Sequence, residues 1–203
     1  MKKFLVLFLA VFMVVGMASV ASAAPVTYFD FDGDKLADTS LLVENVGEAF
    51  TADIYIADVD DTYGGIVSMG LQVSYDSSQV NVTSIAQNAT DWYLPMKDLP
   101  RYDITTGLAE MGGGRLDGLE GTLLLGTITF ECMDEGVSEL LMAELYPELS
   151  TFDSFVAADG HVYDSEIGYG SVDVTQVVPI PGAALLLGSG LLGLVGIKRR
   201  FHL

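Results

Sequence analysis

The sequence predicts an all-β fold, a single jelly-roll-like β-sandwich flanked by an N-terminal signal peptide and a C-terminal transmembrane helix. Three observations support this prediction. Apolar and polar residues alternate with a period of two in several segments between residues 40 and 176. Turn-forming glycine and aspartate residues separate these segments about every ten residues. The two ends of the chain are apolar and cationic, whereas the part between them is strongly acidic.

The N-terminus has the three parts of a secretory signal peptide. Residues 2–3 are lysines, residues 4–15 are continuously apolar, and residues 21–23 read Ala-Ser-Ala, the small residues that precede a cleavage site. An uncleaved membrane helix is the alternative, and the Ala-x-Ala pattern disfavours it. We therefore expect the mature, exported chain to begin at Ala24.

Five segments of the domain alternate between apolar and polar residues, as half-buried strands do. In chain order, the predicted strands cover residues 50–56, 69–75, 80–85, 122–132 and 170–177. Turn signals separate them at the Gly-Gly pair 64–65, the glycines 112–114, Asp117-Gly118 and Asp159-Gly160. Residues 137–149 form the one helix-like stretch, which tertiary contacts can convert into a strand. We assign residues 1–23 to the signal peptide, 24–39 to an acidic segment, 40–176 to the sandwich and 177–203 to the tail.

The C-terminus contains an apolar run that ends in three cations. No residue from 177 to 197 is charged, and a helix of this length spans the roughly 30 Å of a bilayer's hydrocarbon. Lys198, Arg199 and Arg200 follow directly, and such a cluster stays on the cytoplasmic side. This pattern predicts a membrane anchor with the acidic domain on the outside.

The exported part is more acidic than the whole chain. Residues 24–178 contain four of the nine cations and all 28 acids, which is a net charge of −24. Such a surface repels nucleic acid and anionic lipid head groups, so we expect neither as a partner, and it attracts divalent cations. Solubility of an exported protein is the alternative explanation of the charge.

Catalytic motifs are absent from the sequence. His161 is the one histidine of residues 24–178 and lies in a predicted turn, and the single cysteine, Cys132, is interpreted as a small buried hydrophobe. Two carboxylates in a cleft could hydrolyse a glycoside, which leaves a glycoside-active enzyme as a minor alternative. We expect no catalytic residues and no required cofactor.

Four stretches follow one another between residues 40 and 175: "VGEAFTADIYIADVDD", "MGLQVSYDSSQVNVTSI", "GTLLLGTITFECMDEGVSEL" and "YGSVDVT". Their order and spacing resemble cohesin-like β-sandwich domains, which are similar in topology to some carbohydrate-binding modules. The resemblance implies a non-catalytic binding module at a cell surface or in an extracellular matrix.

The tail has Pro179 and Pro181 before the apolar run and the three cations after it. This arrangement resembles the PEP-CTERM sorting signal of Gram-negative, exopolysaccharide-producing bacteria, in a VPxP variant because Ile180 stands where glutamate is usual. The resemblance implies export by the secretion machinery, transient anchoring in the inner membrane, and cleavage near the prolines by an exosortase-like sorting enzyme. The domain then reaches the cell surface or matrix. A permanent anchor without processing is the alternative.

An acidic loop near the start of the domain is the candidate metal site. Four carboxylates occupy positions 1, 3, 5 and 9 of a calcium-binding loop: Asp30, Asp32, Asp34 and Asp38. The pattern is incomplete, because Gly33 falls at position 4 and Leu41 at position 12. A solvated acidic linker is the alternative. A second cluster, Asp58, Asp60 and Asp61, is interpreted as an ordinary polar turn.

Carbohydrate binding, with exopolysaccharide as the ligand, is the predicted function. Trp92, Tyr93 and Tyr102 are the candidate sugar-binding residues, because aromatic faces stack on the C–H faces of sugars. A lone tryptophan in a sandwich is more often part of the core. The alternative function is a structural or adhesive module that binds another protein through a sheet face, as cohesins bind dockerins. An exposed aromatic strip would favour sugar, and a flat polar sheet face would favour protein.

Overall fold

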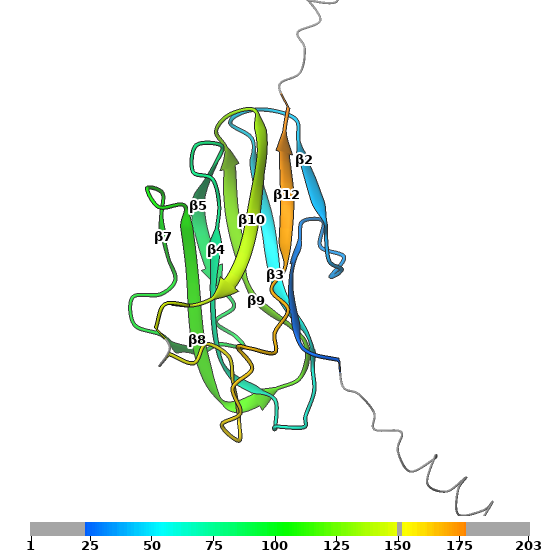
Figure 1. Cartoon of the computed structure of the whole chain (residues 1–203), viewed down its shortest axis with the longest axis vertical. Coiled ribbons are helices and arrows are strands. Elements are labelled where there is room, and N and C mark those ends of the chain that lie inside the picture. Colours follow the sequence, from blue (N-terminus) through cyan, green and yellow to red (C-terminus); the bar gives the residue numbers. More distant parts are fainter. Residues whose placement is uncertain (1–22, 150–151, 178–203) are drawn as a thin grey trace, which may run out of the picture.

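The computed structural model describes residues 23–149 and 152–177, and every regular element in these ranges is a β-strand. The strands form two sheets that pack face to face, as predicted for a β-sandwich (Figure 1). Within the described ranges, no helix has the length and apolar character needed to cross a membrane. The predicted transmembrane helix and the sorting-signal residues lie outside the described residues: Pro179, Pro181, Lys198, Arg199 and Arg200.

The smaller sheet has four strands in the order β1-β3-β9-β5, with the bounds β1 Val26–Asp30, β3 Ala49–Val59, β9 Gly121–Cys132 and β5 Val80–Gln87. The larger sheet has the order β2-β12-β10-β4-β8-β6, with the bounds β2 Ser40–Val43, β12 Ser171–Gln176, β10 Gly136–Glu144, β4 Ile66–Ser74, β8 Leu108–Leu119 and β6 Leu94–Pro95. Two short strands join it: β7 (Arg101–Asp103) on β8 and β11 (Val156–Ala157) on β4. Neighbouring strands are antiparallel except β2 and β12, which are parallel.

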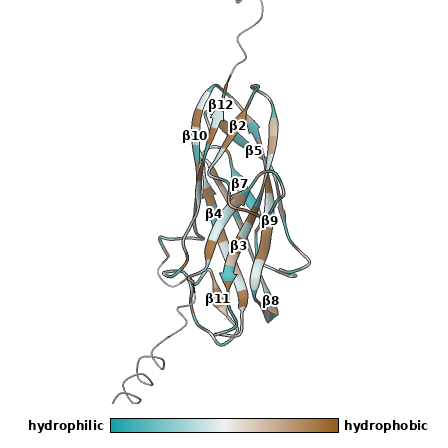
Figure 2. Ribbon diagram, turned by 90° about the vertical axis from the view of Figure 1, so that its right-hand side faces the viewer, coloured by the Kyte–Doolittle hydropathy of each residue, from teal (hydrophilic) through white to brown (hydrophobic). Residues whose placement is uncertain are grey.

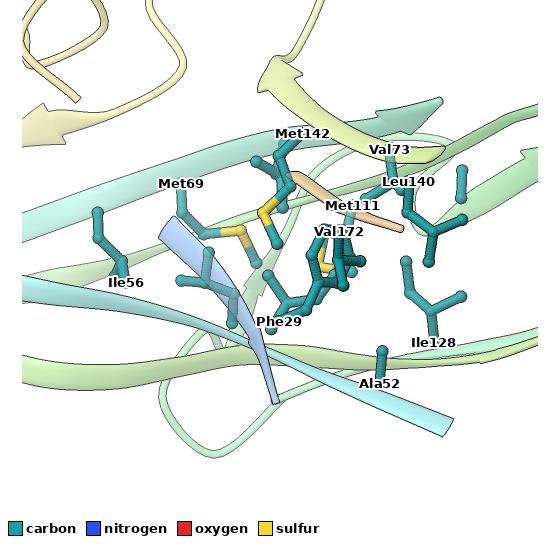
Figure 3. Close-up of a cluster of buried hydrophobic side chains, with 14 of the residues drawn as sticks. Phe29, Ala52, Ile56, Met69, Val73, Met111, Ile128, Leu140, Met142 and Val172 are labelled. Carbon is teal, nitrogen blue, oxygen red and sulfur yellow. The ribbon is translucent and has the colours of Figure 1, made fainter. Parts of the chain in front are cut away.

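Alternation along the strands fills the core between the sheets. In β3, Ala52, Ile54 and Ile56 are fully buried, whereas Thr51 is exposed and Asp53 is half-buried. Side chains of both sheets meet in the middle, including Phe29 from the smaller sheet and Leu140 from the larger one (Figure 3). The hydrophobic colour in Figure 2 lies on the strands of both sheets.

The helix-like stretch that begins at residue 137 is a strand. Ser138, Leu140 and Met142 of β10 are buried, whereas Glu139 and Leu141 are exposed, so the pattern has a period of two. β10 lies between β12 and β4, and this pairing overrides the helical propensity of its Glu, Leu, Met and Ala residues. Cys132 is completely buried, as predicted, and burial raises the pKa of its thiol.

The glycines 112–114 are not a turn, in contrast to the prediction, but lie inside β8. Asp117-Gly118 also belongs to this strand. A Cβ atom on Gly112 would lie 2.6 Å from Met96 Sδ and 2.8 Å from Leu99 Cδ1. The glycines therefore allow other segments to approach the sheet closely, which is a packing requirement that local sequence does not reveal.

The sandwich begins before residue 40, within the segment assigned to 24–39. β1 pairs with β3 in register, with Phe29 opposite Ile54, and Phe29 is 1% exposed. The acidic loop follows Asp30, the last residue of β1. The start of the domain is thus at the strand that follows the predicted cleavage site.

Candidate functional site

The acidic loop follows β1 and brings three of its four predicted carboxylates together. One carboxylate oxygen from each of Asp30, Asp32 and Asp38 lies within 4.8 Å of the others. Asp34 is not part of this group, and its Oδ1 accepts a hydrogen bond from the Leu36 N–H at 2.8 Å. The donor set is all carboxylate, which suits a hard cation such as calcium.

Backbone amides also stabilise this loop. Asp30 is 1% exposed, and its carboxylate accepts hydrogen bonds from the N–H groups of Gly33 at 2.8 Å and Lys35 at 2.9 Å. Asp38 Oδ2 accepts from the Phe31 N–H at 2.7 Å, and the Asp38 N–H donates to the Phe29 carbonyl at 2.9 Å. These bonds close the loop on itself, so the buried charge of Asp30 is compensated by backbone dipoles.

Trp92 is a core residue, which is the alternative raised for it above. Its side chain is 1% exposed, and its indole Nε1–H donates to the Leu124 carbonyl at 3.1 Å. A ring buried in this way offers no free face to an external sugar.

Tyr93 and Tyr102 are exposed but lie at different places along β8. The Tyr102 ring belongs to β7, where Tyr102 pairs with Ala109, and its hydroxyl donates to the Thr83 carbonyl. The Tyr93 hydroxyl accepts from the Leu116 N–H at 3.0 Å, seven positions further along β8 than Ala109. Seven residues of an extended strand span roughly 23 Å. The two rings therefore do not form one stacking platform.

The outer face of the smaller sheet consists of small and polar residues over β3, β9 and β5, whereas the rings of Tyr28 and Tyr55 stack where β1 pairs with β3. Three rows of paired residues cross β3, β9 and β5, and we call these nine residues the open face: Thr51-Thr129-Ser84, Asp53-Thr127-Ala86 and Ala49-Glu131-Asn81. All nine are exposed or half-buried. None is aromatic or cationic, and the Thr127 hydroxyl donates to Asp53 Oδ1 at 2.6 Å. This is the surface type that the sequence analysis associated with protein binding.

The outer face of the larger sheet is covered at its centre. Gly70 and Gly112 pair across β4 and β8, and a Cβ atom on Gly70 would lie 3.1 Å from Leu145 Cβ. Leu145 is fully buried although it follows the last residue of β10. Met96 and Leu99 approach Gly112, as described above. We call this region, with its cover of Met96, Leu99 and Leu145, the covered face.

A groove lies beside the cover and was not predicted. It has a volume of about 530 Å³, and Gln72, Arg101, Glu110 and Tyr146 are among its lining residues. Arg101 forms a bidentate ion pair with Glu110, and its Nη2 donates to the Tyr146 hydroxyl at 3.2 Å. These hydrogen bonds to Glu110 raise the pKa of the Arg101 guanidinium. The partners are 9 and 45 residues apart in sequence, so no local motif marks the groove.

His161 lies in a turn, as predicted, with its ring stacked on Tyr63 at a centroid distance of 3.8 Å. Its Nε2 is 3.0 Å from Glu166 Oε1. The turn is closed by the Ala157 N–H, which donates to the His161 carbonyl at 2.8 Å. The imidazole is thus held between a phenol ring and a carboxylate.

Solved structures of cohesins resemble the sandwich. No protein-family model matches the sequence, and neither does any curated protein. The third cohesin ScaC of Acetivibrio cellulolyticus, solved in complex with the ScaB dockerin, gives a TM-score of 0.53 at 17% identity, over 75% of this chain and 99% of that chain. A non-cellulosomal cohesin from Archaeoglobus fulgidus gives 0.51 at 13% identity, over 80% and 97%.

A third similar structure is the cohesin module of a family 33 glycoside hydrolase from Clostridium perfringens, with a TM-score of 0.53, 12% identity, and coverage of 77% of this chain and 98% of that chain. At these identities the likeness concerns the fold and not the ligand. Because each cohesin is covered almost completely, the described strands correspond to a whole cohesin module. The chain therefore has a cohesin-like β-sandwich fold.

Proposed function

We propose that the domain is a non-catalytic module that binds another protein, and that it docks through the open face of the smaller sheet. The observation that carries this proposal is the composition of that face, on which nine small or polar residues lie in three registered rows. Such a face gives a partner a continuous area in which Glu131 is the one long charged side chain. The cohesin solved with a dockerin supports protein binding as the class of function.

The charges of the open face define the partner's chemistry. Asp53 and Glu131 are its two charged residues, and the exported part as a whole has a net charge of −24. A partner surface that presents lysine or arginine around hydrogen-bonding groups is complementary to it. Attraction between the two surfaces also speeds their encounter and weakens with added salt.

Carbohydrate binding, the function first predicted, has less support. Its three candidate residues do not form one exposed platform, because Trp92 is buried, the Tyr93 hydroxyl bonds to Leu116 of β8, and the Tyr102 hydroxyl bonds to Thr83 of β5. A sugar site built from one exposed ring has little apolar area to offer.

We also propose that the domain is exported and reaches the surface or matrix through its tail. The Ala-Ser-Ala pattern before Ala24 and the run from residue 177 to the three terminal cations support this route. An exosortase-like enzyme is then the partner of the tail. Intact-mass measurement in cells that contain this enzyme should show a chain without residues 185–203, and a retained tail would contradict the processing step.

The docking proposal is tested with surface variants of the exported domain. We expect immobilised wild-type domain to retain a basic surface or matrix protein of the producing cell, and Thr129→Arg, at the centre of the open face, to abolish that retention. Gln72→Arg, in the groove of the larger sheet, is the matched control and should retain the protein. Equal melting temperatures would establish that both variants fold.

Two results would contradict the proposal. If Gln72→Arg abolishes retention and Thr129→Arg does not, the larger sheet is the docking face. If soluble exopolysaccharide from the same cells binds the domain and no protein does so, the function is carbohydrate binding.

A further inference from the structure

A second acidic site lies at the end of the sandwich where the chain enters β1, opposite the end at which β12 finishes (Figure 1). It is a cavity of about 190 Å³. Carboxylates of Asp58, Asp60 and Glu166 are among its lining groups, and residues 23–25 form another part of its wall. Ala24 and Pro25, the first residues of the predicted mature chain, therefore border a cavity that carries negative charge.

Tyr163 lines the cavity and is 3% exposed. Its buried hydroxyl has no hydrogen-bond partner among the residues that the structure describes. A buried hydroxyl in this condition loses its hydration without compensation, unless a ligand supplies a hydrogen bond. Burial, followed by the charge of Asp60, raises the pKa of Tyr163, so the phenol is neutral at physiological pH. A neutral phenol oxygen beside carboxylates suits a ligand that is cationic and donates hydrogen bonds.

The start of the chain is held beside this cavity. The Gly168 N–H donates to the Pro25 carbonyl at 2.9 Å, and the Thr27 N–H donates to the Gly168 carbonyl at 2.9 Å. Gly168 follows the turn that presents Glu166, in which the Glu166 N–H donates to the Tyr163 carbonyl at 2.7 Å. The segment from Tyr163 to Gly168 thus places Tyr163 and Glu166 in the cavity wall, and it also holds Pro25, the residue after Ala24.

We propose that this cavity binds the α-ammonium group of Ala24, which is created when the signal peptide is removed. The proposal rests on the predicted cleavage after Ala23. Hydrolysis of the Ala23–Ala24 bond consumes one water, leaves a carboxylate on Ala23, and leaves an amine on Ala24 that takes up a proton. Before cleavage the same nitrogen is a neutral amide. Removal of the signal peptide therefore adds a positive charge beside the carboxylates of Asp58 and Glu166.

The stabilisation depends on pH in a defined direction. An ammonium bound among carboxylates has a raised pKa in the folded protein. Its contribution to folding stability is therefore complete below the ordinary α-amine pKa of about 7.7–8.0. That contribution disappears as the pH rises through the raised pKa of the folded state. The titratable groups around the site are the carboxylates of Asp58, Asp60, Asp159 and Glu166, the phenols of Tyr63 and Tyr163, and His161. Of these groups, His161 already contacts Glu166, with 3.0 Å between Nε2 and Oε1.

The experiment uses the exported chain purified with its own N-terminus, after sequencing has identified its first residue. NMR titration of alanine-labelled protein should give an α-amine pKa above 7.7–8.0. Asp58→Asn and Glu166→Gln should each lower this pKa towards that range. Asp61→Asn, a neighbouring carboxylate that does not line the cavity, is the matched control and should leave it raised.

Melting temperatures give a second readout. Acetylation of the α-amine should lower the melting temperature at pH 7, and this difference should be absent above the folded-state pKa. An ordinary α-amine pKa in the native protein overturns the proposal even if a variant fails to fold. A first residue other than Ala24, or an acetylation effect that Glu166→Gln leaves unchanged, overturns it as well.

Discussion

The two outer faces of the sandwich differ in what protects them. The open face consists of small and polar residues in three rows. Polar side chains on it bond to each other, as in the hydrogen bond that the Thr127 hydroxyl donates to Asp53. The covered face has glycines at its centre, and Leu145 and Leu99 from two separate segments lie on them. The open face is therefore formed by its strands alone, whereas the covered face also includes the segments that contain Leu99 and Leu145.

This difference separates residues that stabilise the fold from residues that are available to a partner. Residues on the covered face contribute to the folding free energy, because they are buried by the cover. Residues on the open face contribute little to folding and are free to vary with the partner. Substitutions on the two faces should therefore differ in their effects on unfolding, and two measurements test this expectation.

The largest effect is expected for Leu145→Ala. Leu145 is fully buried over Gly70, so its truncation should lower the free energy of unfolding by about 2–5 kcal/mol. Leu141→Ala is the matched control, because Leu141 is 44% exposed on the same sheet and should change stability by only about 0.5 kcal/mol. Urea denaturation measures both. Similar losses in the two variants would show that the cover does not stabilise the sheet.

An intermediate effect is expected for Gly112→Val. The added side chain meets Met96 and Leu99 at less than contact distance and should destabilise the domain by about 1–3 kcal/mol. Ala86→Val makes the same residue at an exposed position of the open face and should stay within about 0.5 kcal/mol of wild type. If Ala86→Val destabilises as strongly, the open face is not free of packing constraints.

The smallest effect concerns the acidic loop, which follows the edge strand of the smaller sheet. If Asp30, Asp32 and Asp38 bind calcium, the ion should stabilise the folded domain by about 1.4 kcal/mol at ten times its Kd, and raise the melting temperature. Asp32→Ala should remove this shift. Asp34→Ala should keep it, because Asp34 lies outside the group of three.

Magnesium at equal ionic strength is the control for this last measurement, because any cation screens the repulsion within a domain of net charge −24. Equal shifts with the two metals, or an unchanged shift in Asp32→Ala, would identify the loop as an acidic turn closed by its own backbone amides.

The sequence predicted the parts of the fold that depend on local alternation. β3 alternates over residues 51–54 and β9 over residues 126–132, and each strand was found close to its predicted position. β10 was ambiguous because its residues favour a helix, and only its place between two strands decides its conformation. β8 was missed because the glycines 112–114 resemble a turn until the side chains above them are known.

The candidate sites were likewise predictable only where they depend on residues close together in sequence. The spacing of Asp30, Asp32 and Asp38 is short enough for a loop to bring them together, so their proximity could be predicted. The cavity around Tyr163 could not, because its walls come from three segments far apart in sequence. Aromatic residues gave the weakest prediction, since Trp92 and Tyr93 are adjacent in sequence and differ completely in exposure.

The parallel pairing of β2 and β12 has a mechanical consequence. β12 is the last described strand, it lies between β2 and β10, and the Val177 N–H adds a bond to the Val43 carbonyl at 3.0 Å. Tension applied through the tail runs along β12 and loads its hydrogen bonds on both sides in shear, all at once. An edge strand that is pulled perpendicular to its length would instead lose its hydrogen bonds one by one. The strand next to the tail is thus in a position to transmit force without peeling from the sheet.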